Sequence, residues 1–119
     1  MSNAGIKVDI SHVGELAVTV RGELDIGSAD ELSQALDNVV ADQNVVVDLS
    51  AVDFMDSSGL AVLLRDSMRR RDAGASLQIR RPSAPVQRLL VFCCLEHLLE
   101  PEVIAEKPPR RWTLRRTKA

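Results

Sequence analysis

The sequence predicts one α/β domain whose mixed β-sheet begins with an antiparallel hairpin and continues in alternating strands and helices packed on the sheet. Three observations predict this. The chain has 119 residues, the length of one domain. Its hydrophobic share of 45% and charged share of 27% are near globular averages. Its apolar residues change from alternating to helical spacing along the chain, which favours parallel strands joined by right-handed crossovers.

A β-hairpin and a helix are the first predicted elements. Apolar residues alternate with polar ones on both sides of Val13 and Gly14, which predicts a hairpin with one buried face. The alternating residues are Ile6, Val8, Ile10, Leu16, Val18 and Val20. The run from Ser28 to Glu31 has the form of a capping box and opens a helix expected over 28–42. Its apolar side is expected to hold Leu32, Ala35, Leu36, Val39 and Val40.

A central strand and a second helix follow. The β-branched run at 45–47 lies between Asn44 and Asp48, which predicts a strand covered on both faces in the middle of the sheet. A loop over 50–56 should lead to a helix over 57–72 that Ala73 and Gly74 end. The apolar side of that helix is expected to hold Leu60, Leu63, Leu64 and Met68, and its outward side Arg65, Asp66, Arg69 and Arg70.

The last elements are a strand containing Leu77 and Ile79 and a helix opened by Ser83 and Pro85. One face of this helix is expected to hold Val86, Leu89, Leu90 and Cys93. Pro101 should end any helix, and Val103–Ile104 is a candidate short edge strand.

The two cysteines, Cys93 and Cys94, are adjacent, which is poor geometry for a disulfide between them, and no cysteine or histidine spacing suggests zinc. Both are therefore expected to be small core or helix-flanking residues, and no metal or cofactor is expected.

Charge divides the chain into an acidic body and a basic tail. Residues 1–106 hold nine basic and all 17 acidic residues, a net charge of −8, whereas residues 107–119 carry +6. We therefore expect a domain at 1–106 and a solvated, mobile tail at 107–119. The acidic body argues against direct nucleic-acid binding, although a basic arm that touches phosphates or acidic partners remains the alternative for the tail. No apolar stretch has the length of a membrane span and no signal pattern is present, so a cytoplasmic protein is expected.

The stretch "FMDSSGLAVLLR" at 54–65 places an acid, two serines and a glycine before a helix. A helix start explains the acid and the methionine: Asp56 would be the N-cap, and Met55 would pack on Leu60 as a hydrophobic staple. Gly59 is unexplained, because glycine in a helix costs about 0.5 to 1 kcal/mol relative to alanine. One hypothesis is that something approaches the backbone there.

The sequence lacks residues that each catalytic interpretation of this stretch requires. A serine nucleophile on a strand-to-helix elbow needs Gly-x-Ser-x-Gly, which is absent, and the available bases are His12 and His97. A receiver-type phosphate acceptor needs further acidic metal ligands and a later lysine, yet no lysine occurs between Lys7 and Lys107. No GxxxxGK[ST] or GxGxxG motif occurs either.

A modification site is the remaining interpretation. A hydroxyl at a helix N-terminus protrudes, and a kinase can add a phosphate there without disturbing the fold. About two negative charges beside Asp53 and Asp56 would then repel an acidic or apolar docking surface.

Two segments resemble the STAS domain of bacterial anti-sigma factor antagonists. They are "VVVDLSAVDFMDSSGLAVLL" at 45–64 and "RGELDIGSADEL" at 21–32, and the likeness spans about residues 6–100 with the elements in the same order. The resemblance implies a STAS-like fold and a binding protein that is not an enzyme. It implies a partner that is both an anti-sigma factor and an ATP-dependent serine kinase, and a serine phosphatase that resets the switch.

By motif match, the resemblance makes Ser57 the phosphate acceptor, with Gly59 letting the kinase come close and Asp25 lying on an adjoining docking loop. The partner would dock on 22–28, on 53–60 and on the first turns of the second helix. The residues implied in partner binding are Gly22, Glu23, Asp25, Asp56, Ser58, Gly59 and Leu60. The family often has a small residue and then glycine where this chain has Cys93 and Cys94, and the basic tail has no counterpart.

Two rival functions stay open. One is a STAS module that scaffolds a stressosome-like or transport-associated complex without a phosphorylation switch. The other, from a different class, is a hydrolase that uses Ser57.

Overall fold

A four-stranded sheet forms the centre of the molecule. The computed structural model describes residues 6–12 and 15–101, and the elements below are those of this part of the chain. The strands are β1 (Ile6–Ser11), β2 (Leu16–Leu24), β3 (Val45–Met55) and β4 (Leu77–Arg80). The helices are α1 (Ala29–Asp37), α2 (Ser57–Asp72) and α3 (Ala84–Phe92), followed by the 3-10 turn η1 (Glu96–Leu98).

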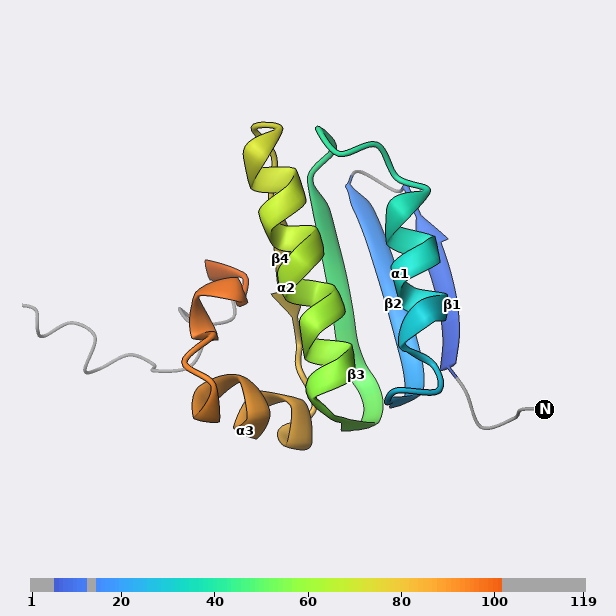
Figure 1. Ribbon diagram of the computed structural model, residues 1–119, viewed down its shortest axis with the longest axis vertical. Coiled ribbons are helices and arrows are strands. Elements are labelled where there is room, and N and C mark those ends of the chain that lie inside the picture. Colours follow the sequence, from blue (N-terminus) through green and yellow to red (C-terminus); the bar gives the residue numbers. More distant parts are fainter. Residues whose placement is uncertain (1–5, 13–14, 102–119) are drawn as a thin grey trace, which may run out of the picture.

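The sheet is mixed, as the sequence predicts. Its order is β1-β2-β3-β4, with β1 antiparallel to β2 and the other two pairs parallel (Figure 1). β3 therefore has a neighbour on each side, and residues 45–47 at its start are all buried. The predictions of an opening hairpin and of a central strand at 45–47 are both confirmed.

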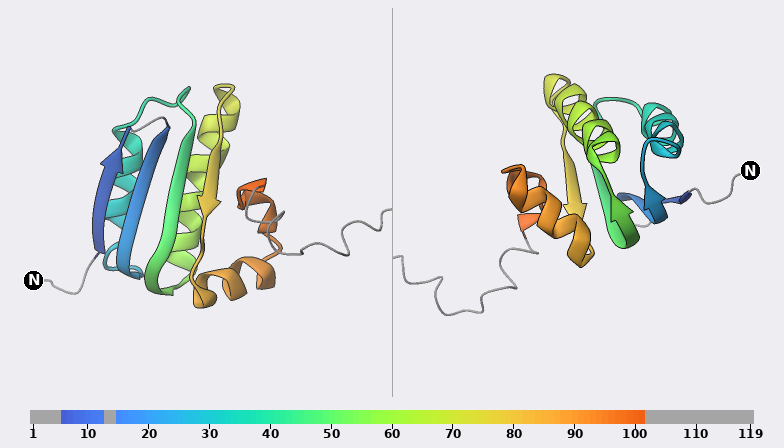
Figure 2. Two further views of the ribbon diagram at one scale, coloured as in Figure 1. Left: turned by 180° about the vertical axis from the view of Figure 1, so that it is seen from behind. Right: turned by 60° about the horizontal axis from the view of Figure 1, so that its bottom comes forward.

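Helices α1 and α2 pack side by side on one face of this sheet. Seen from behind, the strands lie in front and no described helix covers them (Figure 2). The core consists mainly of leucine and valine side chains from β2, β3, β4 and the helices. β1 is an edge strand, so Ile10 keeps 45% of its surface exposed, whereas Leu16, Val18 and Val20 of β2 are buried.

Strand β3 is longer than predicted. The loop expected over 50–56 is strand as far as Met55, which pairs with Leu24 of β2, and only Asp56 separates it from α2. The strand continues through polar residues because their side chains are accommodated on the open face. Ser50 is exposed there, and the buried Asp48 carboxylate is paired with the Arg81 guanidinium.

The buried side of α2 differs from the prediction in its second half. Arg70 and Asp66 were expected to point outward, but they are 0% and 5% exposed, whereas Met68 is 49% exposed. Leu60 and Leu63 are buried as predicted, and Leu64 is half-buried.

Arg70 is buried because α1 and the segment after it offer carbonyl oxygens that can accept from its guanidinium. Its guanidinium donates to the carbonyls of Leu36, Val40 and Gln43, at 2.8 to 3.0 Å, and to the Asp66 carboxylate at 2.6 Å. The last carbonyls of a helix have no partner within the helix, and a cation there also complements the helix dipole. Arg70 thus joins the C-terminal end of α1 to α2.

Helix α1 is shorter than predicted. It ends at Asp37, not at 42, and Val40, expected on its apolar side, is 66% exposed. Leu32 and Leu36 are buried as predicted and Val39 is also buried, so the helical pattern located the inner face but not the end of the helix.

In the C-terminal part, the prediction was wrong at one residue at the end of α3, and it missed the turn η1. Val86 and Leu90 of α3 are buried as predicted, but Cys93 is exposed. The turn η1 was not predicted, nor was the bridge by which Leu99 pairs with Ile79 of β4. The turn at Val13–Gly14, the candidate strand at Val103–Ile104 and the tail at 107–119 lie outside the described residues.

Candidate docking and modification site

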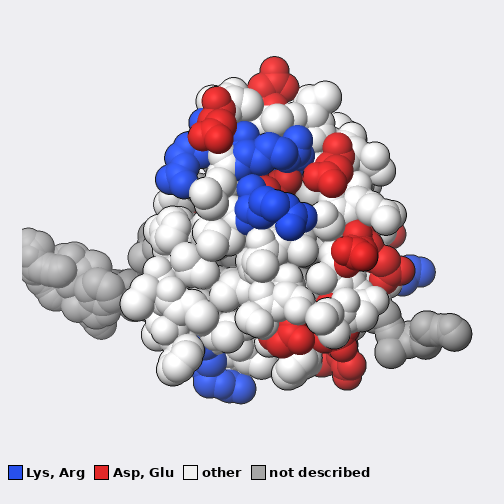
Figure 3. All heavy atoms as spheres, in the orientation of Figure 1, with Lys and Arg blue, Asp and Glu red and all other residues white. Residues whose placement is uncertain are grey.

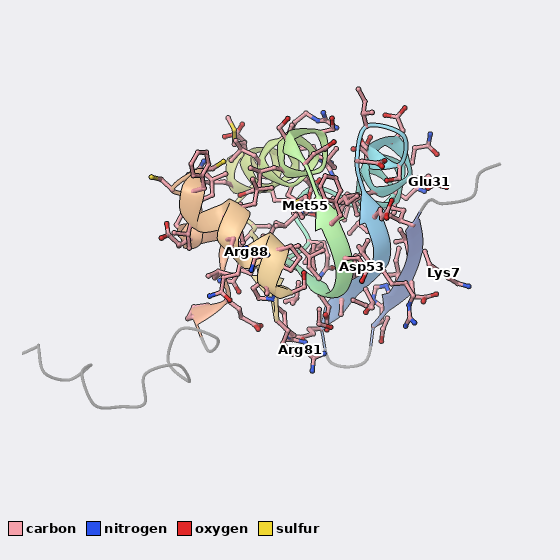
Figure 4. All side chains as sticks on the ribbon, turned by 90° about the horizontal axis from the view of Figure 1, so that it is seen from below. Lys7, Glu31, Asp53, Met55, Arg81 and Arg88 are labelled. Atoms are coloured by element: carbon pink, nitrogen blue, oxygen red, sulfur yellow. The ribbon has the colours of Figure 1, made fainter. Side chains whose placement is uncertain are left out.

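The candidate site lies where the carboxyl ends of β2 and β3 meet the amino ends of α1 and α2. The Asp56 N–H donates to the Leu24 carbonyl at 3.2 Å, which fixes the start of α2 beside the end of β2. Figure 4 looks onto this end: Asp53 and Met55 of β3 lie between α1, which carries Glu31, and α3, which carries Arg88. The segments 22–28 and 53–60 are therefore neighbours, as predicted.

Asp56 is the N-cap of α2. Its backbone is extended, and its carboxylate accepts from the N–H groups of Ser58 at 2.8 Å and Gly59 at 3.4 Å. These are two of the N–H groups that a helix start leaves without a partner. The predicted cap is confirmed. Met55 and Leu60, the two residues of the predicted staple, are both buried.

Ser57 is the first residue of α2, and it is exposed. Its hydroxyl has no hydrogen-bond partner within residues 6–12 and 15–101. Ser58 is half-buried, so of the two adjacent hydroxyls that of Ser57 is the more accessible.

Gly59 faces the protein interior. The interpretation that it lets a kinase approach the backbone is therefore wrong. A Cβ at this position would stand 2.6 Å from Leu24 Cγ and 2.9 Å from the Leu24 carbonyl oxygen. Contacts under 3.0 Å force a neighbour to move. Glycine is therefore required for α2 to pack against β2, and this close approach is inside the protein.

The loop after β2 is held by its own side chains. The Ser28 hydroxyl donates to the Glu23 carbonyl at 2.6 Å and accepts from the Asp25 N–H at 3.1 Å. The Asp25 carboxylate accepts from the Gly27 N–H at 3.0 Å. Ser28 precedes α1 but makes no side-chain cap hydrogen bond, so the predicted capping box is wrong: its hydroxyl serves the loop.

This loop presents Ile26 to the solvent. Ile26 is 82% exposed, whereas Asp25 is half-buried and bonded within the loop. Phe54, which pairs with Glu23 across β3 and β2, is 48% exposed. Neither apolar residue was singled out from the sequence. An isoleucine between Asp25 and Gly27, outside any amphipathic pattern, was the available signal for Ile26.

Of the other residues of the implied docking face, some are exposed and could touch a partner, and others only stabilise the fold beneath it. Glu23 is exposed. Gly22 is half-buried at a break in the β2–β3 register, with φ of 111°, where glycine avoids strain. Leu60 is only 6% exposed and belongs to the core.

Carboxylates surround this end of the molecule. They come from the end of β2 and its loop, from the first turn of α1 and from the end of β3: Glu23, Asp25, Asp30, Glu31, Asp53 and Asp56. Figure 3 shows acidic side chains gathered at the lower right of this face, and basic side chains higher up and at the lower left. A partner that docks here must accept negative charge together with exposed apolar surface.

Catalysis at Ser57 finds no support in the histidine positions. His12 follows β1 at Ser11, which pairs with Ala17, so it lies at the opposite end of the sheet from the Leu24–Met55 pair. His97 lines a cavity with Ser67 and Arg71, in the second half of α2. No group of three metal-ligating side chains occurs among the described residues. No described helix is long and apolar enough to cross a membrane.

The groups with shifted pKa values lie away from this site. Burial acts to raise the pKa of the Asp48 carboxyl, but hydrogen bonds from Arg81 and Ser50 outweigh it and hold that pKa below its usual value. Hydrogen bonds to Glu100 and Glu15 raise the pKa of the Arg80 guanidinium. Both arrangements stabilise the fold at the β4 side of the sheet.

Comparison with known families decides the class of the protein. The family model described as "Mlab, STAS domain" matches residues 6–100, which include every element from β1 to η1. The chain belongs to the STAS domain family.

Relatives of this STAS domain include anti-sigma factor antagonists. It is 33% identical over 82 residues to the anti-sigma F factor antagonist of Paenibacillus polymyxa, covering 66% of this chain and 70% of that protein. It is 31% identical, with a TM-score of 0.66, to the crystal structure of an anti-sigma factor antagonist from Mycobacterium paratuberculosis, covering 82% and 86% of the two chains.

Unphosphorylated SpoIIAA shares the fold of this STAS domain. The TM-score is 0.62 at 22% identity, and the match covers 84% of this chain and 95% of that one. The predicted STAS-like fold is confirmed.

Proposed function

We propose that this STAS domain is an anti-sigma factor antagonist, a binding protein without catalysis, and that phosphorylation of Ser57 switches its binding off. The observation that carries the proposal is the exposed Ser57 hydroxyl, which has no hydrogen-bond partner in the described chain and lies beside the loop that presents Ile26. Relatives described as anti-sigma factor antagonists support the class of function.

In the unmodified state, the partner docks on the surface that contains Ile26, Phe54 and Ser57. We propose an anti-sigma factor with ATP-dependent serine kinase activity as this partner, and its capture as the event that releases a sigma factor. Ile26 and Phe54 supply the apolar contacts, because both are exposed on loops or strand ends held in place by hydrogen bonds. A surface fixed before binding loses less conformational entropy on association.

The switch is electrostatic. A phosphate on Ser57 carries about −1.5 to −2 charges. The N–H groups of Ser58 and Gly59, which would otherwise neutralise it, already bind the Asp56 carboxylate. The added charge therefore lacks these two donors and stands beside Asp56 and Asp53, and a partner that fits the neutral hydroxyl loses affinity. A serine phosphatase restores the hydroxyl.

The experiment is a pulldown with candidate anti-sigma kinases in ADP and in ATP. The proposal requires retention of this protein with ADP and its phosphorylation and release with ATP. A STAS scaffold would bind its partner equally in both nucleotides and would carry no phosphate. A hydrolase would instead be labelled at Ser57 by a serine-reactive probe without any kinase.

A further inference from the structure

The C-terminal end of α3 carries two free thiols on an uncharged surface. Cys93 and Cys94 are both exposed, and the two residues before them, Val91 and Phe92, are 50% and 85% exposed. Residues 89–95 contain no charged side chain, and Arg88 and Glu96 flank them. The proposed docking function uses none of these residues.

Cys94 occupies a backbone position that favours glycine. Its φ is 58°, and the helix ends in a Schellman motif: the Leu95 N–H donates to the Leu90 carbonyl at 2.8 Å and the Cys94 N–H to the Val91 carbonyl at 3.1 Å. A left-handed conformation costs a non-glycine residue about 1 to 2 kcal/mol. Packing does not compensate for that cost, since the residue is exposed.

The two thiols of one chain are poorly placed to bond to each other. Adjacent Cα atoms are about 3.8 Å apart across a trans peptide, whereas disulfides usually join Cα atoms about 4.4 to 6.8 Å apart. Oxidation of this pair is therefore directed to a thiol of another molecule.

We propose that Cys94 is an oxidation site through which two copies of this chain join by a disulfide, with the exposed surface of Val91 and Phe92 as the contact around it. A second copy fits because an uncharged patch can face itself about a two-fold axis without repulsion between like charges. A patch of a single sign of charge would repel itself there.

The bond is essential to this dimer. Stable interfaces bury about 1,200 to 2,000 Å² and use about 20 to 30 residues a side. The patch of Val91, Phe92 and the two cysteines is far smaller, so the copies associate only weakly while the thiols are reduced.

A peroxide is the class of oxidant that balances the reaction. The Cys94 thiolate of one copy attacks the peroxide oxygen, which gives a sulfenic acid and releases water once the leaving hydroxide takes up the thiol proton. The Cys94 thiolate of the second copy attacks the sulfenic sulfur, forming the disulfide and a second water. Two thiols are oxidised and one peroxide is reduced.

The test compares five proteins after reductant is removed and hydrogen peroxide is added: the full chain and its Cys93→Ser, Cys94→Gly, Phe92→Ser and Val40→Ser variants. Non-reducing electrophoresis and intact mass follow the products. Cys94→Gly suits the left-handed backbone, so a loss of dimer in it reflects the thiol and not a damaged fold. Val40→Ser, at another exposed apolar residue, is the control for Phe92→Ser.

The parent, Cys93→Ser and Val40→Ser should form a dimer that a reducing agent reverses. Cys94→Gly should stay monomeric, and Phe92→Ser should dimerise several-fold more slowly. The proposal is overturned by a parent that stays monomeric after oxidation, by a dimer that survives in Cys94→Gly, or by Phe92→Ser dimerising at the parent's rate.

Discussion

Gly59 of α2 lies directly against Leu24 of β2, with no room for a side chain between them. A Cβ on Gly59 would stand 2.6 Å from Leu24 Cγ and 2.9 Å from its carbonyl oxygen. This contact sets the position of the first turn of α2, and with it the position of Ser57.

Gly59→Ala should destabilise the fold by about 1 to 3 kcal/mol, the usual cost of overpacking a core. This cost exceeds the 0.5 to 1 kcal/mol or so that alanine gains over glycine in a helix. Urea unfolding measures it. Gly27→Ala is the matched control, because its Cβ would meet only Asp25 Oδ1 at 3.5 Å. Equal stabilities for the two variants would mean that α2 does not need this close contact.

Arg70→Met should cost about 1.5 to 3 kcal/mol, since it removes the buried charged donor of Asp66, which then keeps only Arg69 at 3.1 Å, and one donor each from the carbonyls near the end of α1. Arg71→Met, one position on and exposed, should change the free energy of unfolding by less than about 0.5 kcal/mol. Denaturant titration of both variants checks the role of Arg70 in joining α1 to α2. A small loss in Arg70→Met would show that this junction is dispensable.

Asp48 should make the fold sensitive to acid. Its native pKa is lowered by Arg81 and Ser50, so its ionised form is favoured in the folded state. The stabilisation is complete above the ordinary carboxyl pKa of 3.8 and disappears as pH falls through the lowered native value. Asp48→Asn should therefore be less stable than the parent at pH 7, and the difference should narrow below about pH 4. A difference that stayed constant from pH 7 to pH 3 would rule out this role.

Ile26→Ser should weaken binding to the anti-sigma partner at least about fivefold, because a central apolar contact contributes more than about 1 kcal/mol. Val40→Ser replaces an apolar residue of similar exposure, 66% against 82%, beyond the C-terminal end of α1, and should bind as the parent does. Calorimetry in ADP measures both affinities. If the two variants bind alike while the parent binds well, the partner does not contact Ile26.

Apolar patterns located the sheet and the inner faces of β2 and α1, and the residue types that favour a helix start located the cap at Asp56. These patterns failed where polar side chains are buried together. Arg70 and Asp66 look like an outward-facing pair at helical spacing. Their burial depends on carbonyl oxygens at and after the end of α1, which are distant in sequence. The length of β3 was missed for a similar reason, since Asp48 interrupts the apolar run and its partner Arg81 lies 33 residues later.

The sequence predicts the candidate site only in part, for the same reason. The motif predicts Ser57 as the acceptor, but the roles of its neighbours depend on contacts across the sheet. Gly59 is explained by Leu24, and the Ser28 hydroxyl by the Glu23 carbonyl. Neither contact has a periodic signature in the sequence.

The central claim is that Ser57 accepts the phosphate. The direct measurement is phosphate incorporation, by mass spectrometry of the intact protein and its peptides, after incubation with a cognate anti-sigma kinase and ATP. The parent and Ser58→Ala should each gain one phosphate, on Ser57, and lose affinity for the partner, while Ser57→Ala should gain none and stay bound. Phosphorylation of Ser57→Ala at the parent's rate, or unchanged binding by the phosphorylated parent, would contradict the account.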